Sequence, residues 1–286
     1  MKRTPFLSVL MTAYNREQFI VEAIESVLAS TYKNFELIIA DDGSTDDTVL
    51  IARSYAAKDD RIQVYVNAQN LGDYNNRNKT ASYATGEFIM YVDSDDKILT
   101  DGFERCISVM QQFPAASFGM QLKDEKTVPY FLTAEEVIRR HFFEKPCLMI
   151  GPGGTILRRS FFEQIEKYPV KYGPANDMYF NLKAAAAGGV VFLPFEFNYY
   201  RIHQGQEQSN KYNYLYNGYN YLRDALKELA LPLTEKEKRW ISNKNKRRFL
   251  VNLFQYLIRS KSISKTRAAR KLAGFGWRDT FNALFH

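Results

Sequence analysis

Three acidic side chains crowd into four residues of this sequence, Asp93-Ser94-Asp95-Asp96. They follow an apolar run at residues 88–92 that predicts a buried strand. Carboxylates this close repel one another unless a positive charge lies among them. Mg²⁺ and Mn²⁺ prefer carboxylate and phosphate oxygens, so a divalent cation bound together with a phosphorylated substrate is one interpretation. A solvated acidic turn is the other.

Polar side chains also follow two earlier apolar runs. Asp42 lies in Asp41-Asp42-Gly43-Ser44, where a carboxylate could accept the imide N–H of uracil or thymine, or a ribose hydroxyl. A capped turn with Gly43 at positive φ is the alternative. Tyr14 ends the first run, in Thr12-Ala13-Tyr14-Asn15, and is either a stacking platform for a base or an ordinary loop tyrosine.

Three further residues could take part in chemistry, and each also has a purely structural interpretation. Arg77 lies in a polar helix, where it is either a solvated cation or a phosphate ligand. Asp177 follows Asn176 at the start of an expected helix, where an acid commonly serves as a cap. His203 follows an aromatic strand expected at residues 195–200, and is either a structural residue or a ligand.

Strands and helices alternate along the first hundred residues. Apolar runs predict four strands, and helical periodicity predicts helices between them, the second with Ser44 or Thr45 as its N-cap. The strands are expected at residues 6–13, 35–40, 62–66 and 88–92, and the helices at 16–30, 44–55 and 75–84. This alternation predicts an α/β fold with a mainly parallel sheet flanked by helices. Ligands of such sheets bind at the carboxyl ends of the strands, where the polar clusters lie.

Charge is distributed unevenly. The chain carries 39 basic and 32 acidic residues, but residues 234–286 alone have 14 basic and 3 acidic ones, a net charge of +11. The other residues have a net charge of −4. The basic character therefore belongs to the tail, and we expect no nucleic-acid binding by the main domain. Cys106 and Cys147 are too few for a disulfide framework, which favours reduced thiols in a cytoplasmic protein.

Five segments, taken in order, resemble glycosyltransferase family 2, an inverting family with the GT-A fold. The match is strong over residues 6–100 and weaker to about residue 209, and the tail shows no motif of the family. The segments are SVLMTAYN (8–15), AIESV (23–27), FELIIADDGS (35–44), NLG (70–72) and GEFIMYVDSDD (86–96). The resemblance implies a GT-A domain at residues 1–210, with a nucleotide-sugar half (1–100) and an acceptor half (101–210). From about residue 211 the sequence becomes basic, aromatic and helical in pattern, which predicts a helical region at 211–286.

The resemblance also implies roles for individual residues. Asp95 would be the direct ligand of Mn²⁺ or Mg²⁺, paired with Asp93 and approached by His203. Asp177 would be the catalytic base, with Asn176 in place of the usual glutamate. Tyr200-Arg201-Ile-His203 with Ser209 resembles another family segment. The nucleotide-sugar site would comprise Thr12, Ala13, Tyr14, Asp42, Arg77, Asp93 and Ser94.

The implied reaction is a hexosyl or N-acetylhexosaminyl transfer from a nucleoside-diphosphate sugar, with UDP favoured, to a saccharide or lipid-linked saccharide. Asp177 would remove the proton of the attacking hydroxyl, and a single displacement would invert the anomeric centre. Surface-polysaccharide assembly is the setting by analogy. A nucleotidyltransferase is disfavoured because Thr12 to Arg16 is not a glycine-rich phosphate loop. A catalytically silent sugar-nucleotide binder and a nucleic-acid-binding tail stay open.

The tail has two interpretations. Phe249, Leu250, Leu253, Phe254, Leu257 and Ile258 form an apolar stripe on an expected helix with basic flanks. The stripe either packs against the main domain or a second subunit in a homodimer, or lies on the anionic inner face of a membrane. No run of about 18 apolar residues is found, so we expect a cytoplasmic protein with, at most, peripheral membrane contact.

Overall fold

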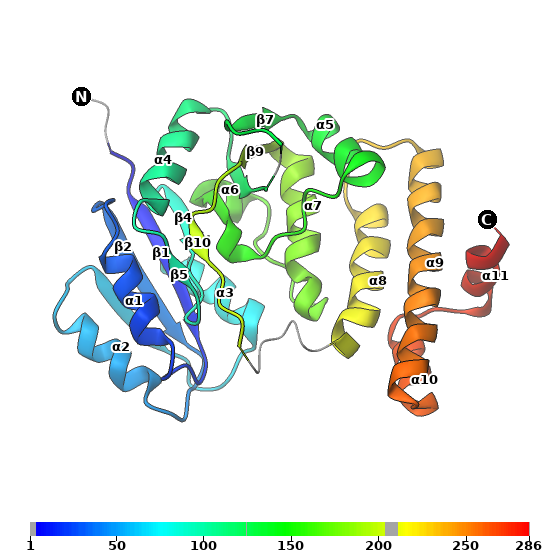
Figure 1. Cartoon of the computed structure of the whole chain (residues 1–286), viewed down its shortest axis with the longest axis horizontal. Coiled ribbons are helices and arrows are strands. Elements are labelled where there is room, and N and C mark those ends of the chain that lie inside the picture. The colour runs from blue at the N-terminus through cyan, green and yellow to red at the C-terminus, as the bar shows by residue number, and fades with distance from the viewer. Residues whose placement is uncertain (1–3, 124, 204–210, 286) are drawn as a thin grey trace.

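The computed structural model describes residues 4–123, 125–203 and 211–285 of the 286-residue chain. Its centre is an eight-stranded sheet in the order β3-β2-β1-β4-β8-β6-β9-β7 (Figure 1). β1 to β4 pair in parallel, whereas β8 runs antiparallel to both β4 and β6. The strands are β1 (Leu7–Ala13), β2 (Phe35–Asp41), β3 (Ile62–Val66), β4 (Phe88–Tyr91), β6 (Phe118–Gln121), β7 (Tyr130–Leu132), β8 (Thr155–Arg158) and β9 (Val190–Leu193).

Helices cover both faces of this sheet because successive strand residues point to opposite sides. Val9 and Met11 face one apolar layer, and Leu10 faces the other. The first layer includes α1 (Ile20–Leu28), α2 (Thr48–Ala56) and α4 (Gly102–Gln112). The second includes α3 (Asp73–Ser82), α5 (Ala134–Arg139), α6 (Arg159–Gln164) and α7 (Asn176–Gly188). A small sheet pairs β5 (Lys97–Ile98) with β10 (Asn198–Tyr199).

The four early strands lie where the sequence predicts them, but some boundaries differ. The helix expected from residue 44 begins at Thr48, because Ser44 donates its backbone N–H and hydroxyl to the Asp41 carboxylate and closes the turn after β2. Ser44 is therefore not a helix cap, and Asp47 takes the N-cap position instead of Thr45. The aromatic strand expected at 195–200 is limited to Asn198–Tyr199. Cys106 and Cys147 are both buried, and they form no disulfide with each other.

The C-terminal region consists of α8 (Lys211–Glu228), α9 (Glu235–Ser260), α10 (Ile263–Leu272) and α11 (Trp277–Phe285). In Figure 1, α7, α8, α9 and α11 follow one another away from the sheet. α8 is fixed to the second layer by apolar contacts and by two hydrogen bonds, from Tyr172 Oη to Asp224 Oδ2 (3.1 Å) and from Tyr179 Oη to Glu228 Oε2 (2.9 Å). Within the described residues, no helix is long and apolar enough to span a membrane.

Two of the six residues of the predicted apolar stripe are buried inside the protein. Phe249 and Leu253 on α9 are buried in a tail cluster, with the Phe249 ring 4.8 Å from Tyr219 and 4.9 Å from Phe275. Phe254 and Ile258, from the same stripe, are exposed. One side of α9 therefore packs against other helices of the C-terminal region, and for the other side both a second subunit and a membrane stay open as predictions.

Replacing Phe249 by Ala should lower the free energy of unfolding by about 3–5 kcal/mol, because it empties the centre of the tail cluster. Phe254→Ala, on the opposite side of the same helix, should change it by less than about 0.5 kcal/mol. Urea unfolding of the two variants measures the difference. Equal losses of stability would contradict this division of α9 into a buried and an exposed side.

Candidate functional site

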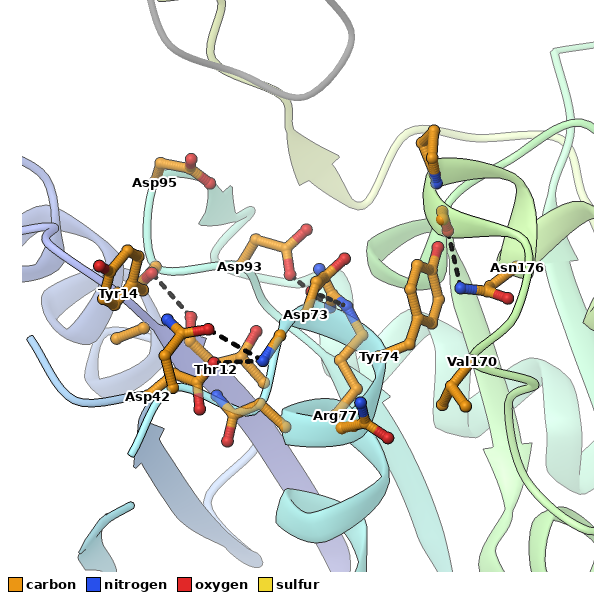
Figure 2. Close-up of a pocket in the computed structure, with 18 of the residues that line it drawn as sticks. Thr12, Tyr14, Asp42, Asp73, Tyr74, Arg77, Asp93, Asp95, Val170 and Asn176 are labelled. Atoms are coloured by element: carbon orange, nitrogen blue, oxygen red, sulfur yellow. Dashed lines mark hydrogen bonds and ion pairs between the residues drawn. The ribbon is translucent and has the colours of Figure 1, made fainter. Parts of the chain in front are cut away.

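A cavity of about 620 Å³ opens where the carboxyl ends of β1, β2 and β4 meet α3 (Figure 2). Its volume suits a small-molecule ligand. The parallel pairing of these strands brings their polar ends together, as the sequence predicts. The expected residues in the cavity wall are Thr12, Ala13, Tyr14, Asp42, Arg77, Asp93, Ser94 and Asp95.

Arg77 is buried and lies between two carboxylates. Its Nη1 donates to Asp93 Oδ1 (2.6 Å), and its Nε donates to Asp73 Oδ1 (2.8 Å), as the dashed lines and labels in Figure 2 show. Its backbone carbonyl accepts a hydrogen bond from Tyr91 Oη (3.0 Å). The interpretation of Arg77 as a solvated cation is therefore wrong. Asp73, which the sequence analysis did not single out, shares the charge of this guanidinium.

Asp95 is the meeting point of two other groups. Arg16 Nε lies 3.1 Å from Asp95 Oδ2, and His203 Nε2 lies 3.0 Å from the same oxygen. Arg201 N donates to the neighbouring Asp96 (2.9 Å), and burial raises the pKa of Asp96 to about 7. The acidic segment is thus largely enclosed and charge-compensated, so the interpretation as a solvated turn is wrong. Arg16 was missed, although it directly follows the Thr12 to Asn15 segment.

The donor set around Asp95 fits a divalent cation of the Mn²⁺ or Mg²⁺ type. Carboxylate oxygens suit these ions, and His203 adds one imidazole nitrogen. Across the described parts of the chain, no group of three or more acidic, histidine or cysteine side chains is arranged as a ready-made site. Because Asp93 is held by Arg77, a cation at Asp95 would need oxygens from a phosphorylated ligand as well.

Asp42 supports the wall of the cavity. Its Oδ1 accepts from Asn67 Nδ2 and Leu71 N (both 2.8 Å), and its Oδ2 accepts from the Gly72 N (2.9 Å). These bonds hold the loop that leads into α3. The alternative of a capped turn describes the neighbouring Asp41 instead, and Gly43 has the expected positive φ of 81°.

Asn176 and Asp177 begin α7, as the sequence predicts. Asn176 closes the preceding turn, because its Oδ1 accepts from Tyr172 N (2.9 Å) and its Nδ2 donates to Gly173 O (2.7 Å). Burial raises the pKa of Asp177 to about 7, against the opposing effects of its bond from Met178 N and the charge of Arg77.

The structure does not place Asp177 itself in the cavity wall. Among the described residues, the wall on this side consists of Val170, Gly173, Pro174 and Asn176, together with Asn213 from α8. Gly151 adjoins Asp177, since a Cβ at Gly151 would lie 3.8 Å from Asp177 Oδ2. Asn213 comes from the helical region and carries no family motif, so only the fold reveals its place. Ser209 lies outside the described residues.

Comparison with known proteins decides the family. The model of glycosyl transferase family 2 matches residues 8–166, more than half of the chain. The chain belongs to glycosyltransferase family 2. The chain is 38% identical to glycosyltransferase EpsE of Bacillus subtilis over 129 residues. This match covers 44% of the chain and 46% of EpsE. The matches cover between 17% and 54% of the lengths of the first four curated relatives.

A longer match extends over most of a second relative. WfgD of Escherichia coli, a UDP-Glc:α-D-GlcNAc-diphosphoundecaprenol β-1,3-glucosyltransferase, is 27% identical over 227 residues, which cover 76% of this chain and 85% of WfgD.

Two solved structures have a similar fold. The structure of S. aureus TarS (residues 1–349) in complex with UDP-GlcNAc has a TM-score of 0.67 at 22% identity. The match covers 98% of this chain and 78% of the TarS chain. The structure of the mannosyltransferase PcManGT of Pyrobaculum calidifontis in complex with GDP-Man and Mn²⁺ has a TM-score of 0.61 at 13% identity. This match covers 99% of this chain and 88% of the PcManGT chain. The predicted GT-A fold with added C-terminal helices is therefore confirmed.

Asp42→Asn should lower the free energy of unfolding by about 1–3 kcal/mol, because an amide cannot accept all three hydrogen bonds and places its own N–H groups against a backbone donor. Asp60→Asn, at an exposed position of the same domain, is the matched control and should be neutral. Thermal unfolding without ligand measures both. An unchanged stability in Asp42→Asn would show that these bonds do not hold the loop.

Proposed function

We propose that this protein transfers a sugar from a UDP-sugar to a hydroxyl group of a saccharide, with inversion at the anomeric carbon. The observation that carries the proposal is the convergence of Asp95, Asp93 and Arg77 with the ends of β1 and β2 in one cavity of a family 2 glycosyltransferase. Carboxylates, buried arginine and a polar wall are what a diphosphate with a bound cation requires.

The nucleoside would lie against Thr12, Ala13, Tyr14 and Asp42. Tyr14 is exposed at the cavity, where its ring can stack on a base. A carboxylate oxygen can accept two hydrogen bonds, and Asp42 Oδ2 accepts one from Gly72, so it can also accept the imide N–H of uracil. TarS, of similar fold, is solved with UDP-GlcNAc, which supports UDP as the nucleotide.

The diphosphate would lie beside Ser94, Arg77 and Asp95. Asp95 and His203, with Asp93 next to them, would hold Mn²⁺ or Mg²⁺. Such a cation, when bound, neutralises charge on the departing diphosphate, and the Mn²⁺ in the PcManGT complex supports its presence. Arg77 supplies a fixed positive charge at the same place, and its ion pairs with Asp73 and Asp93 hold it there before the ligand binds.

Asp177, which follows Asn176 of the cavity wall and adjoins Gly151, would be the general base for an acceptor that reaches its carboxylate. With a pKa of about 7, its carboxylate is ionised in a large fraction of molecules at neutral pH and still basic enough to remove a hydroxyl proton. The hydroxyl oxygen attacks the anomeric carbon as the bond to the diphosphate breaks, so the protein needs no nucleophile of its own. Val170, Pro174 and Asn213 line the side of the cavity from which an acceptor would enter.

A lipid-linked saccharide is the acceptor class that we propose, since WfgD acts on a diphosphoundecaprenol-linked sugar. The protein would then work at the inner face of a membrane, with contact through residues 234–286. A screen of UDP-sugars with a diphosphoundecaprenol-linked acceptor, scored by UDP release, tests the activity. Release of UDP from no donor, by protein that binds UDP, would favour a catalytically silent sugar-nucleotide binder.

Asp95→Ala should remove most of the gain in UDP affinity that Mn²⁺ provides, because it deletes the carboxylate that His203 approaches. Affinity without metal should change much less. Titration calorimetry with and without Mn²⁺ measures both, and Asp60→Ala serves as the control. If Mn²⁺ strengthens UDP binding equally in Asp95→Ala and the wild type, the cation is not held at Asp95.

Asp177→Asn should lower the rate of transfer by about 10²–10⁴-fold and leave UDP binding intact, because an amide keeps the shape and loses the basicity. In the wild type, kcat/KM should rise with pH through about 7, as the raised pKa of Asp177 requires the carboxylate to lose its proton in that range. The variant should lose this rise, and Asp60→Asn should keep it. A rate of sugar transfer near that of the wild type in Asp177→Asn would show that Asp177 is not the general base.

A further inference from the structure

The exposed side of α9 carries large apolar residues. Val251, Phe254 and Ile258 recur at the spacing of one helical face and lie opposite Phe249 and Leu253. Phe254 is 63% exposed, whereas Phe249 in the tail cluster is 2% exposed. The tail cluster therefore accounts for one face of this helix and leaves the other in contact with solvent.

α11 adds a second exposed face beside α9. The two helices are in contact, with Ala283 buried in the tail cluster and Lys246 Nζ 3.1 Å from Asp279 Oδ1. Trp277, Phe281 and Leu284 recur at the same helical spacing on α11 and are all exposed, Trp277 by 80%. We name these three residues, together with Val251, Phe254 and Ile258, the outer face. Large apolar residues that are exposed on two helices in contact with each other mark an interaction surface.

Basic residues border the outer face, and acidic residues are far fewer in the same region, with 3 acidic against 14 basic residues at 234–286. Lys244 lies two turns and Arg247 one turn before Val251 on the same side of α9, and both are exposed. The three acidic residues of 234–286 are each engaged elsewhere: Glu235 pairs with Lys238, Glu237 with Arg139, and Asp279 with Lys246. Residues 234–286 thus combine exposed apolar side chains with a strongly positive net charge.

We propose that the outer face docks on an anionic lipid surface. Apolar and aromatic side chains would enter the headgroup boundary, while Lys244 and Arg247 meet lipid phosphates. A second copy of the chain is disfavoured, because a symmetric contact would bring two regions of net charge +11 together. Nucleic acid would match the charge but leaves the six apolar residues without a partner. The inference rests on the proposed function for its purpose, which is to hold the enzyme beside a lipid-linked acceptor.

Vesicle sedimentation of the full-length protein tests the proposal. We expect association with vesicles of phosphatidylcholine and phosphatidylglycerol, little association with phosphatidylcholine alone, and weakening by salt. Trp277→Ala combined with Phe281→Ala should lower the partition coefficient by about tenfold or more. The matched control is Leu50→Ser, which removes an exposed apolar side chain from α2.

Charge is tested separately by Lys244→Glu combined with Arg247→Glu, which should also lower partitioning by about tenfold or more. Arg53→Glu on α2 combined with Lys58→Glu just after this helix changes the net charge equally and should have little effect. Stabilisation by UDP should be the same in all these variants, so failure to dock and failure of the proposed function are distinguishable.

Three outcomes would overturn the proposal. The first is equal failure of the folded wild type to associate with either vesicle at low salt. The second is unchanged partitioning of the Trp277 and Phe281 double variant. The third is a dimer in solution that this double variant converts to a monomer, or tail-dependent retention on DNA or RNA, in a protein that does not bind anionic vesicles.

Discussion

A buried guanidinium joins the two parts of the chain that build the site. Arg77 on α3 pairs with Asp73 one turn earlier and with Asp93 at the end of β4. Such a charge is tolerable in the interior only because its partners are in place, and removing one partner of a buried pair typically costs about 3–5 kcal/mol. The contact therefore fixes α3 against the strand end and leaves Asp95 to face Arg16 and His203.

This division explains how an acidic segment can be both stable and available to a ligand. Asp93 is committed to the protein through Arg77, whereas Asp95 interacts with the partly exposed Arg16 and with His203, whose backbone lies after the small β5–β10 sheet. Incoming cation and phosphate groups need to replace only these contacts. On the other side of the cavity, α8 holds the turn before α7 through Tyr172 and Asp224, so the C-terminal region helps to place Asp177.

Much of this arrangement can be predicted from the sequence, because it depends on local patterns. The apolar runs before Asn15, Asp42 and Asp93 set the strands, and parallel pairing then brings their ends together. The contacts of Arg16 and His203 with Asp95 join residues 79 and 108 positions apart, and no local pattern encodes such distances. Periodicity likewise shows that α9 is amphipathic without showing that Phe249 is covered and Phe254 is not.

The central claim is that the strand ends form a cation-assisted site for a uridine diphosphate. A thermal-shift comparison of UDP, GDP, dTDP and CMP, each with and without Mn²⁺, tests it most directly, because a ligand that binds the folded state raises the unfolding temperature according to its affinity. The account predicts the largest increase for UDP with Mn²⁺ and a clearly smaller one for UDP alone. No increase with any nucleotide, or an increase for UDP that Mn²⁺ does not alter, would contradict it.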